Sequence, residues 1–247
     1  MCKISVCLAA YNGERFIKKQ ILSILMQLSD KDELIISDDG STDNTINIIH
    51  SINDHRIKCI YHNKSEVRNS KNSLYYIVAS NFENALSCAS GDIIFLSDQD
   101  DIWAPNKVEI YLKALERADL VQGNYTYIDI NDNEILGKRF CSSPFKNMVY
   151  DLFVLPFHGA SMAFKRNILN LALPFPANLI QHDSYLGKIA LLRGKCTFIS
   201  LPLTFYRVHE HNVSQPGSKS PNSLIFKIYF RVRLLYQAIY ASFIKHK

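Results

Sequence analysis

The sequence predicts an α/β fold with a mostly parallel sheet covered by helices. Five short apolar runs alternate with four segments in which apolar residues recur at helical spacing. This alternation is typical of parallel sheets, because each helix returns the chain to the edge where the next strand begins. A length of 247 residues, with 47% hydrophobic and 21% charged residues, suits one domain or one domain with an appendage, and excludes a disordered or collagen-like chain.

The first half of the pattern begins with a strand at residues 4–9, which a Tyr-Asn-Gly turn closes. A helix should follow at residues 16–28, because apolar residues recur there every three or four positions. The second strand is expected at residues 33–37. The next helix should include residues 46–49 and begin at one of the candidate N-caps in residues 42–44.

The second half of the pattern begins with a strand at residues 57–61, which a polar stretch at residues 62–73 follows. A helix through residues 82–86 should end near Ser90 and Gly91. The last elements are a strand at residues 92–96, a helix at residues 106–117 and an extended segment at residues 120–130.

Acidic side chains cluster where two of the predicted strands end. Asp38 and Asp39 follow the second strand, and Asp98, Asp100 and Asp101 follow the fourth. Ligands of parallel α/β sheets bind outside the carboxyl ends of the strands, so we expect a site here. Carboxylates this close repel one another, and Mg²⁺ or Mn²⁺ relieves the repulsion while sharing its coordination with substrate phosphates. The alternative is an acidic loop in which Asp101 caps the following helix.

The Asp-Asp-Gly-Ser-Thr-Asp turn at residues 38–43 lacks the glycine pattern of dinucleotide sites and the Gly-Lys-Ser/Thr of P-loops. A carboxylate at this position is able to accept a hydrogen bond from a base N–H or a ribose hydroxyl. We assign that role to Asp39, whereas Asp43 is expected to stabilise the turn or cap the helix.

Several segments carry these residues in a recognisable order. They are residues 5–13, 36–43 and 95–103, the last of which reads Phe-Leu-Ser-Asp-Gln-Asp-Asp-Ile-Trp. With this order and spacing the chain resembles the family 2 glycosyltransferases, which are inverting enzymes of the GT-A (Rossmann-like) fold. Residues 159–164 and 181–185 resemble the acceptor-side segment and the short acidic motif of that family. Residues 206–214 are similar to the closing Tyr-Arg-x-His-x-x-Asn segment of bacterial polysaccharide glycosyltransferases.

The resemblance implies roles for individual residues. Asp39 would read the nucleotide base, with Asp38 beside it, and Asp98 would approach the ribose. Asp100 of the D-x-D motif would bind the Mn²⁺ or Mg²⁺ ion, and His209 would face the diphosphate and the metal. Asp183 would deprotonate the acceptor hydroxyl. The resemblance adds Ala10, Tyr11, Asn12 and Arg207 on the donor side, and Gly159, Ser161 and His182 on the acceptor side.

The chemistry of inversion agrees with these roles. It needs one base on the acceptor side and stabilisation of the charge on the leaving diphosphate. Asp183 meets the first need, while His182 is left open between orienting Asp183 and simply packing. The roles of Arg68 and Lys71 in the polar stretch also stay open. Glu210 is unfavourable beside a diphosphate unless it points away.

Positive charge is concentrated at the end of the chain. The formal net charge is +5, and residues 184–247 hold ten Lys or Arg residues and one acid, Glu210. Pro and Gly residues set an apolar, aromatic and basic extension at residues 216–247 apart from a catalytic domain at residues 1–215. We expect this extension to be a helix that lies on an anionic membrane or packs on its own domain. Nucleic acid is a third option, but no recognition module supports it, so we expect no nucleic-acid partner.

These observations predict a metal-dependent inverting hexosyltransferase. Its donor would be UDP-glucose or UDP-galactose, and its acceptor a glycan on undecaprenyl diphosphate, as in O-antigen and lipopolysaccharide biosynthesis. dTDP-rhamnose is the alternative donor, because the Ser-Asp-Gln-Asp-Asp-Ile-Trp form recurs in rhamnosyltransferases. The chain lacks the Gly-x-Gly-Thr-Arg loop of a sugar nucleotidyltransferase, and the alternative outside enzymes is an inactive sugar-nucleotide-binding or membrane scaffold protein.

The sequence also predicts where the protein works. Its six cysteines are scattered, and it shows neither a signal-peptide pattern nor an apolar run of about 18 residues. We therefore expect a cytoplasmic protein attached peripherally to the inner face of the cell membrane.

Overall fold

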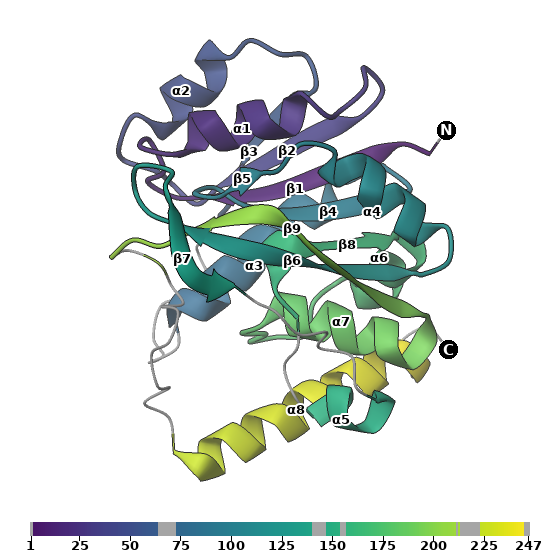
Figure 1. Ribbon diagram of the computed structural model, residues 1–247. Helices are drawn as coiled ribbons and strands as arrows, with labels where there is room; N and C mark the ends of the chain where they lie inside the picture. Colours follow the sequence, from purple (N-terminus) through teal and green to yellow (C-terminus); the bar gives the residue numbers. More distant parts are fainter. Residues whose placement is uncertain are drawn as a thin grey trace.

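The computed structural model of the chain describes residues 2–63, 73–139, 147–153, 157–210, 212 and 223–244. The predicted α/β fold class is confirmed, because a curled central sheet carries helices on both of its faces (Figure 1). A long helix packs beneath the helices on one side, at the bottom of the view in Figure 1.

The first half of the sheet is parallel. It consists of β1 (Ile4–Ala10), β2 (Glu33–Asp38), β3 (Ile57–Tyr61) and β4 (Ile93–Asp98), in the order β3-β2-β1-β4. The connecting helices are α1 (Ile17–Leu25), α2 (Thr45–Ser51) and α3 (Ser73–Ser87). Ala10 lies beside Asp38, and Ala9 lies beside Asp98. The acidic turns after β2 and β4 therefore meet at the same edge of the sheet.

The second half of the sheet is mixed. Its strands are β5 (Ile102–Trp103), β6 (Leu120–Ile128), β7 (Glu134–Arg139), β8 (Met162–Lys165) and β9 (Cys196–Arg207). β8 runs antiparallel between β4 and β6, while β6 and β9 are parallel. The short strands β5 and β7 pair antiparallel with β9 and β6. Parallel pairing thus extends from β1 to β4 and recurs once, between β6 and β9.

The core is divided between the two faces of the sheet. On one face α1, α2 and α4 (Lys107–Leu115) bury Ile21, Ile49 and Tyr111. On the other face α3, α6 (Arg166–Ala172) and α7 (His182–Arg193) bury Phe82, Ile168 and Tyr185. This second face also supports the acceptor-side segments, because α7 begins at His182.

The helix of the C-terminal extension, α8 (Leu224–Phe243), packs on α6 and α7, and α5 (Met148–Phe153) lies against α7 and α8. Leu234, Ala238 and Ala241 of α8 are almost completely buried in this contact. The described part of the extension therefore packs on its own domain.

The expected boundary between residues 215 and 216 lies outside the described residues, as do Lys245 and Lys247. Within the described ranges, no helix has both the length and the apolar character needed to cross a bilayer.

Candidate active site

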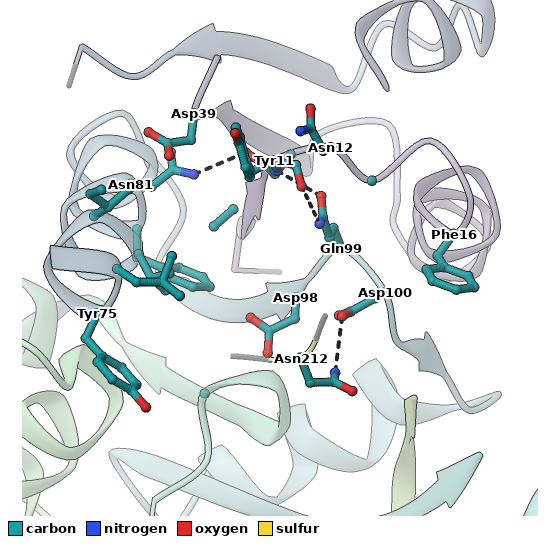
Figure 2. Close-up of a pocket in the computed structure, with 18 of the residues that line it drawn as sticks. Tyr11, Asn12, Phe16, Asp39, Tyr75, Asn81, Asp98, Gln99, Asp100 and Asn212 are labelled. Carbon is teal, nitrogen blue, oxygen red and sulfur yellow. Dashed lines mark hydrogen bonds between the residues drawn. The ribbon is translucent and has the colours of Figure 1, made fainter. Parts of the chain in front are cut away.

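A cavity of about 1010 Å³ lies outside the carboxyl ends of β1, β2 and β4 (Figure 2). Residues from both halves of the chain line it. Those expected from the sequence are Ala10, Tyr11, Asn12, Asp39, Asp98, Asp100, Gly159, His182, Asp183 and His209. Three other expected residues, Asp38, Ser161 and Arg207, do not line the cavity and are buried beside it.

The loop after β1 is tied to the loop after β2. The Asn12 amide donates to Ser41 Oγ at 2.9 Å, and Asn12 Oδ1 accepts from the Thr42 amide at 2.8 Å. Asp38 accepts from the Gly40 and Ser41 amides, so its carboxylate shapes this turn rather than facing a ligand. As expected, Asp43 stabilises the turn, accepting from the Thr45 amide at 3.0 Å. These loops are held in place before any ligand arrives.

Asp39 is oriented by a histidine that the sequence analysis missed. His62 Nδ1 lies 2.7 Å from Asp39 Oδ1, and His62 Nε2 lies 2.9 Å from Ser80 Oγ on α3. His62 directly follows β3, just as the acidic residues directly follow β2 and β4. This position at the end of a parallel strand could have identified His62 as a site residue from the sequence. One carboxylate oxygen of Asp39 is thereby held, in a residue that lines the cavity.

Gln99, the middle residue of the D-x-D motif, joins the loops after β1 and β4. Its side chain accepts from the Tyr11 amide at 2.9 Å and donates to the Tyr11 carbonyl at 2.8 Å (Figure 2). The approach is so close that a Cβ on Gly13 would lie 2.3 Å from Gln99 Oε1. A side chain at position 13 would therefore displace the Gln99 amide from this pair of hydrogen bonds.

The acidic residues after β4 have unusual electrostatics. Burial, followed by the charges of Asp100 and Asp183, raises the pKa of Asp98 to about 7. Burial also raises the pKa of Asp101 well above its usual value. Asp101 accepts from the Arg207 amide at 3.0 Å, whereas Asn106 is the N-cap residue of α4. The alternative in which Asp101 caps the following helix is therefore wrong.

A fully buried lysine lies behind these carboxylates and was not singled out from the sequence. Lys107 Nζ donates to the Ala160 carbonyl at 3.0 Å and to Thr204 Oγ1 at 2.8 Å. Burial lowers its pKa to about 7, while the charges of Asp101 and Asp98 oppose that shift. Lys107 thus supports the segment before β8 and lies beneath the acidic turn, where Asp101 and Asp98 favour its protonated form.

Arg207 lies behind the cavity and holds the loop that carries Asp100. Its Nε donates to the Asp100 carbonyl at 2.8 Å, its Nη1 donates to the Asp129 carbonyl, and its Nη2 forms an ion pair with Asp132 at 2.6 Å. Only 1% of its surface is exposed. Expected as a donor-binding residue, Arg207 instead positions the loops that carry Asp100, because all of its described polar contacts are internal.

Asp100 is bonded to the residues that close the family-like C-terminal motif. His209 Nε2 lies 2.8 Å from Asp100 Oδ2, and Asn212 Oδ1 accepts from the His209 amide at 2.6 Å. Figure 2 shows Asp98 and Asp100 beside one another on the cavity wall. The residues outside the masked ranges contain no preassembled group of three His, Cys, Asp or Glu side chains around a metal position. Asp98, Asp100 and His209 nevertheless supply oxygen and nitrogen donors that fit a divalent ion completed by phosphate oxygens.

The acceptor side is built around the first turn of α7. Asp183 Oδ2 accepts from the Gly159 amide at 3.3 Å, and Asp183 Oδ1 accepts from the Ser184 amide at 2.7 Å. Ser161 is buried, and its carbonyl accepts from Tyr111 Oη at 3.0 Å. Ser161 is therefore a support for the segment that carries Gly159.

Three residues that line this cavity each have one buried polar atom without a hydrogen-bond partner in the described part of the chain. These atoms are Asn81 Oδ1, Gln181 Oε1 and His182 Nε2. The His182 ring stacks on Phe82 with 4.1 Å between centroids, and burial lowers its pKa. A buried polar group without a hydrogen bond costs about 1–3 kcal/mol, so a ligand that supplies these bonds would be favoured. The sequence analysis did not single out Asn81, which resembles an ordinary surface amide, or Gln181, which lies in the acidic motif at residues 181–185 but was given no role.

The sequence left the roles of four residues undecided, and the structure describes two of them. His182 packs on Phe82 and also presents a free ring nitrogen beside Gly159. Glu210 lines the cavity. Arg68 and Lys71 lie outside the described residues.

Comparisons with known proteins agree with the fold and the order of the motifs. The family model described as "Glycosyl transferase family 2" matches residues 5–171. The chain is 31% identical over 255 residues to an Escherichia coli protein named UDP-Glc:alpha-D-GlcNAc-diphosphoundecaprenol beta-1,3-glucosyltransferase WfaP. That match covers 98% of this chain and 95% of the relative.

Two solved structures illustrate the likeness of fold. S. aureus TarS in complex with UDP-GlcNAc matches with a TM-score of 0.67 and 18% identity, over 96% of this chain and 66% of TarS. Glucosyl-3-phosphoglycerate synthase from Mycobacterium tuberculosis in complex with Mg²⁺ and UDP matches with a TM-score of 0.55 and 21% identity. The second match covers 98% of this chain and 79% of the synthase. These likenesses show the fold, which is the GT-A fold that the sequence predicted.

Proposed function

The chain belongs to glycosyltransferase family 2, and on that premise we propose that it transfers a hexose with inversion from a nucleotide sugar to a lipid-linked glycan. The observation that carries the proposal is the convergence of four carboxylates, Asp39, Asp98, Asp100 and Asp183, on one cavity. They reach it from the ends of two strands, β2 and β4, and from the start of α7. The three unpartnered polar atoms in the same cavity support the presence of a polar ligand.

The donor nucleotide would bind where the loops after β1, β2 and β4 meet. Asp39, held by His62, would accept a hydrogen bond from the base, while Ala10, Tyr11 and Asn12 form the adjoining wall. Asp98 would accept from the ribose. UDP-glucose is our first choice of donor, because the E. coli relative WfaP is named as an enzyme that uses UDP-glucose. UDP-galactose and dTDP-rhamnose are the alternatives.

The diphosphate would bind beside Asp100. With Asp98 and His209, this residue would hold Mn²⁺ or Mg²⁺, which stabilises the negative charge that develops on the leaving diphosphate. The Mg²⁺ and UDP of the mycobacterial synthase support this assignment by analogy of fold. Arg207 and Asp38, both buried, would position this machinery without touching the donor.

Asp183 would be the catalytic base. The acceptor hydroxyl oxygen would form a bond to the anomeric carbon as the bond from that carbon to the diphosphate breaks, and Asp183 would take the hydroxyl proton. The Gly159 amide fixes one oxygen of Asp183 at 3.3 Å. His182 and Gln181 would bind the acceptor sugar through the polar atoms that have no partner in the described chain.

The acceptor would be a saccharide on undecaprenyl diphosphate, in the biosynthesis of a bacterial O-antigen or a related surface polysaccharide. The name of the E. coli relative, with its diphosphoundecaprenol acceptor, supports this substrate class. The enzyme would then work at the cytoplasmic face of the membrane as a peripheral protein. Residues 1–215 would form its catalytic domain, and residues 216–247 an extension toward the membrane.

A donor screen tests the proposed function. The full chain is incubated with Mn²⁺ and, separately, UDP-glucose, UDP-galactose, UDP-GlcNAc, GDP-mannose or dTDP-rhamnose, and release of the free nucleotide is measured. We expect UDP release from UDP-glucose, with a further increase when a GlcNAc-diphosphate lipid is added. Release from dTDP-rhamnose alone would select the alternative donor. Donor binding without turnover, with or without acceptor, would indicate an inactive sugar-nucleotide-binding protein.

A further inference from the structure

Helix α8 is apolar on two opposite faces. Its inner face, with Leu234, Ala238 and Ala241, is buried against the body of the protein. Its outer face carries large apolar side chains that recur every three or four residues and lie exposed. They are Ile225, Ile228, Tyr229, Val232, Tyr236, Ile239, Tyr240 and Phe243. Ile225 is 80% exposed and Tyr236 65% exposed, so the helix leaves a continuous apolar stripe uncovered.

Helix α5 extends this exposed apolar surface. It lies against α8 at the lower edge of the molecule in Figure 1. Val149, Tyr150 and Phe153 of α5 are all exposed, with Val149 at 68%. The acid of this short helix, Asp151, is buried. Two helices from separate parts of the chain therefore present apolar and aromatic side chains at the same end of the protein.

The charges of α8 all have the same sign. Lys227, Arg231 and Arg233 are partly exposed, and the helix contains no acidic residue. With about 3.6 residues per turn, Arg233 lies at the edge of the stripe, whereas Lys227 and Arg231 lie nearer the inner face. Arg233 also reaches the carbonyl oxygens of Ala177 and Asn178, at 3.3 and 3.4 Å, so it helps to hold α8 in this orientation. Tyrosines such as those on the stripe suit the boundary between lipid headgroups and acyl chains, where one end of the ring is apolar and the other wet.

We infer that the outer face of α8, together with α5, docks on an anionic lipid bilayer, with α8 lying in the plane of the headgroups. This inference deepens the proposed function and rests on it for the identity of the lipid surface. A second copy of the chain is a less suitable occupant, because α8 offers no acidic side chain that could pair with Arg233 of another α8. Anionic headgroups would pair with Arg233 at the edge of the stripe, and the positive charge of the helix would attract them, while the apolar stripe leaves water.

The geometry connects this surface to the site. α8 packs directly on α7, and the first turn of α7 carries His182 and Asp183. One layer of helix therefore separates the proposed bilayer surface from the acceptor side of the cavity. Docking would place that side, rather than the donor side, toward the membrane.

Flotation with lipid vesicles tests the inference. The full chain is mixed with vesicles of phosphatidylethanolamine and phosphatidylglycerol in about equal parts, and with vesicles of phosphatidylcholine alone. We expect flotation with the anionic vesicles only, and weaker binding as salt is raised, because exposed charges are screened beyond about 10 Å at 0.1 M. Absence of binding to anionic vesicles at low salt would overturn the inference, as would equal binding to neutral vesicles.

Two triple variants locate the surface. Tyr229→Ser, Val232→Ser and Tyr236→Ser together remove three exposed outer-face side chains and should reduce vesicle binding at least ~10-fold. The matched control combines Leu22→Ser, Met26→Ser and Leu201→Ser, which are exposed apolar residues elsewhere, and should bind as the unaltered chain does. Equal loss in both variants, or in neither, would contradict the assignment of the surface.

Two further measurements separate this inference from the proposed function and from self-association. Vesicle binding by a chain that turns over no donor would leave the docking surface standing and refute the enzyme. Turnover with a water-soluble acceptor but no vesicle binding would do the reverse. Sedimentation without lipid should show a monomer. A dimer that only the outer-face variant dissociates would assign the stripe to a second copy and overturn the inference.

Discussion

The proposed donor side and the proposed acceptor side of the cavity differ in how their polar groups are paired. On the donor side, Asn12, Asp38 and Gln99 each form two or more hydrogen bonds within the protein. On the acceptor side, Gln181 Oε1 and His182 Nε2 are buried and have no partner in the described structure. Hydrogen bonds within the chain thus hold the donor loops in place. On the acceptor side, two polar atoms are left for a ligand to pair with.

This difference bears on how the two substrates are recognised. Groups fixed before binding lose little freedom when a ligand arrives, so they suit the charged diphosphate, whose leaving must be stabilised at a defined position. Unpartnered groups gain most when a ligand pairs them. The difference is not complete, because Asn81 Oδ1 and Asp101 Oδ2 are also unpartnered within the described residues, and the Asn81 side chain reaches the Ala10 carbonyl beside β1.

The largest expected effect comes from breaking the donor side at Asp100. Asp100→Ala removes a carboxylate proposed to hold the metal, and turnover should fall by ~10³-fold or more, since metal stabilisation of the leaving group contributes several kcal/mol. Nucleotide release with Mn²⁺ is the measurement. Asp30→Ala, at an exposed acid away from the cavity, should leave turnover unchanged. Full activity of the unaltered enzyme in excess EDTA would contradict the metal assignment.

A second variant breaks the acceptor side while sparing the donor side. Asp183→Asn keeps the shape of the side chain but removes the base, so kcat should fall at least ~10²-fold. Donor affinity, measured by calorimetry well above pH 7, should change little, because Asp98 is then ionised with or without the charge of Asp183 beside it. A variant with unaltered kcat would place the base elsewhere. A variant with weakened donor binding would undo the division of the cavity into two sides.

The pH dependence of donor binding sharpens the comparison. The pKa of Asp98 is raised to about 7, so this carboxyl is ionised above that pH and takes up a proton as the pH falls through it. Metal and ribose both need the ionised form, and donor affinity should therefore fall by up to ~10-fold per pH unit below pH 7. Calorimetric titration of UDP with Mn²⁺ between pH 5 and pH 8, in steps of about one pH unit, measures this dependence. A flat profile would show that Asp98 does not titrate in this range.

The smallest expected effect concerns His182. His182→Phe keeps an aromatic ring to stack on Phe82 but removes the unpartnered Nε2. Loss of one hydrogen bond to the acceptor should raise the acceptor KM by up to ~10-fold, with kcat changed less. Donor affinity serves as the internal control. If KM is unchanged, His182 only packs, and the reserve of hydrogen bonds on the acceptor side is smaller than the structure suggests.

The sequence predicted the fold class and the family, because the signals for both are local. Regular alternation of strands and helices runs through residues 4–130, and each acidic turn follows directly on a strand. The mixed half of the sheet was not predicted. β8 has only four residues, and its place between β4 and β6 depends on pairing with strands about 40 to 70 residues away in the chain.

Residues around the site divide in the same way. The sequence singles out Arg207, yet its place behind Asp100 depends on Asp129 and Asp132, which lie in a turn far from the motif. Lys107 escaped attention because a lysine at the start of a helix is ordinarily exposed. Whether a polar residue contacts a ligand, or instead holds a ligand-binding residue in place, depends on which distant segments bury it. A short sequence motif does not show that burial.

The outer stripe of α8 also affects how often the enzyme would meet its acceptor. A protein and a lipid-linked saccharide that share one membrane surface move in the same thin layer, so geometry sets their local concentration more than the bulk amount does. An acceptor side with few preformed bonds is then sufficient, because confinement to two dimensions replaces part of the affinity. Rates measured with a water-soluble acceptor would accordingly understate turnover at the membrane.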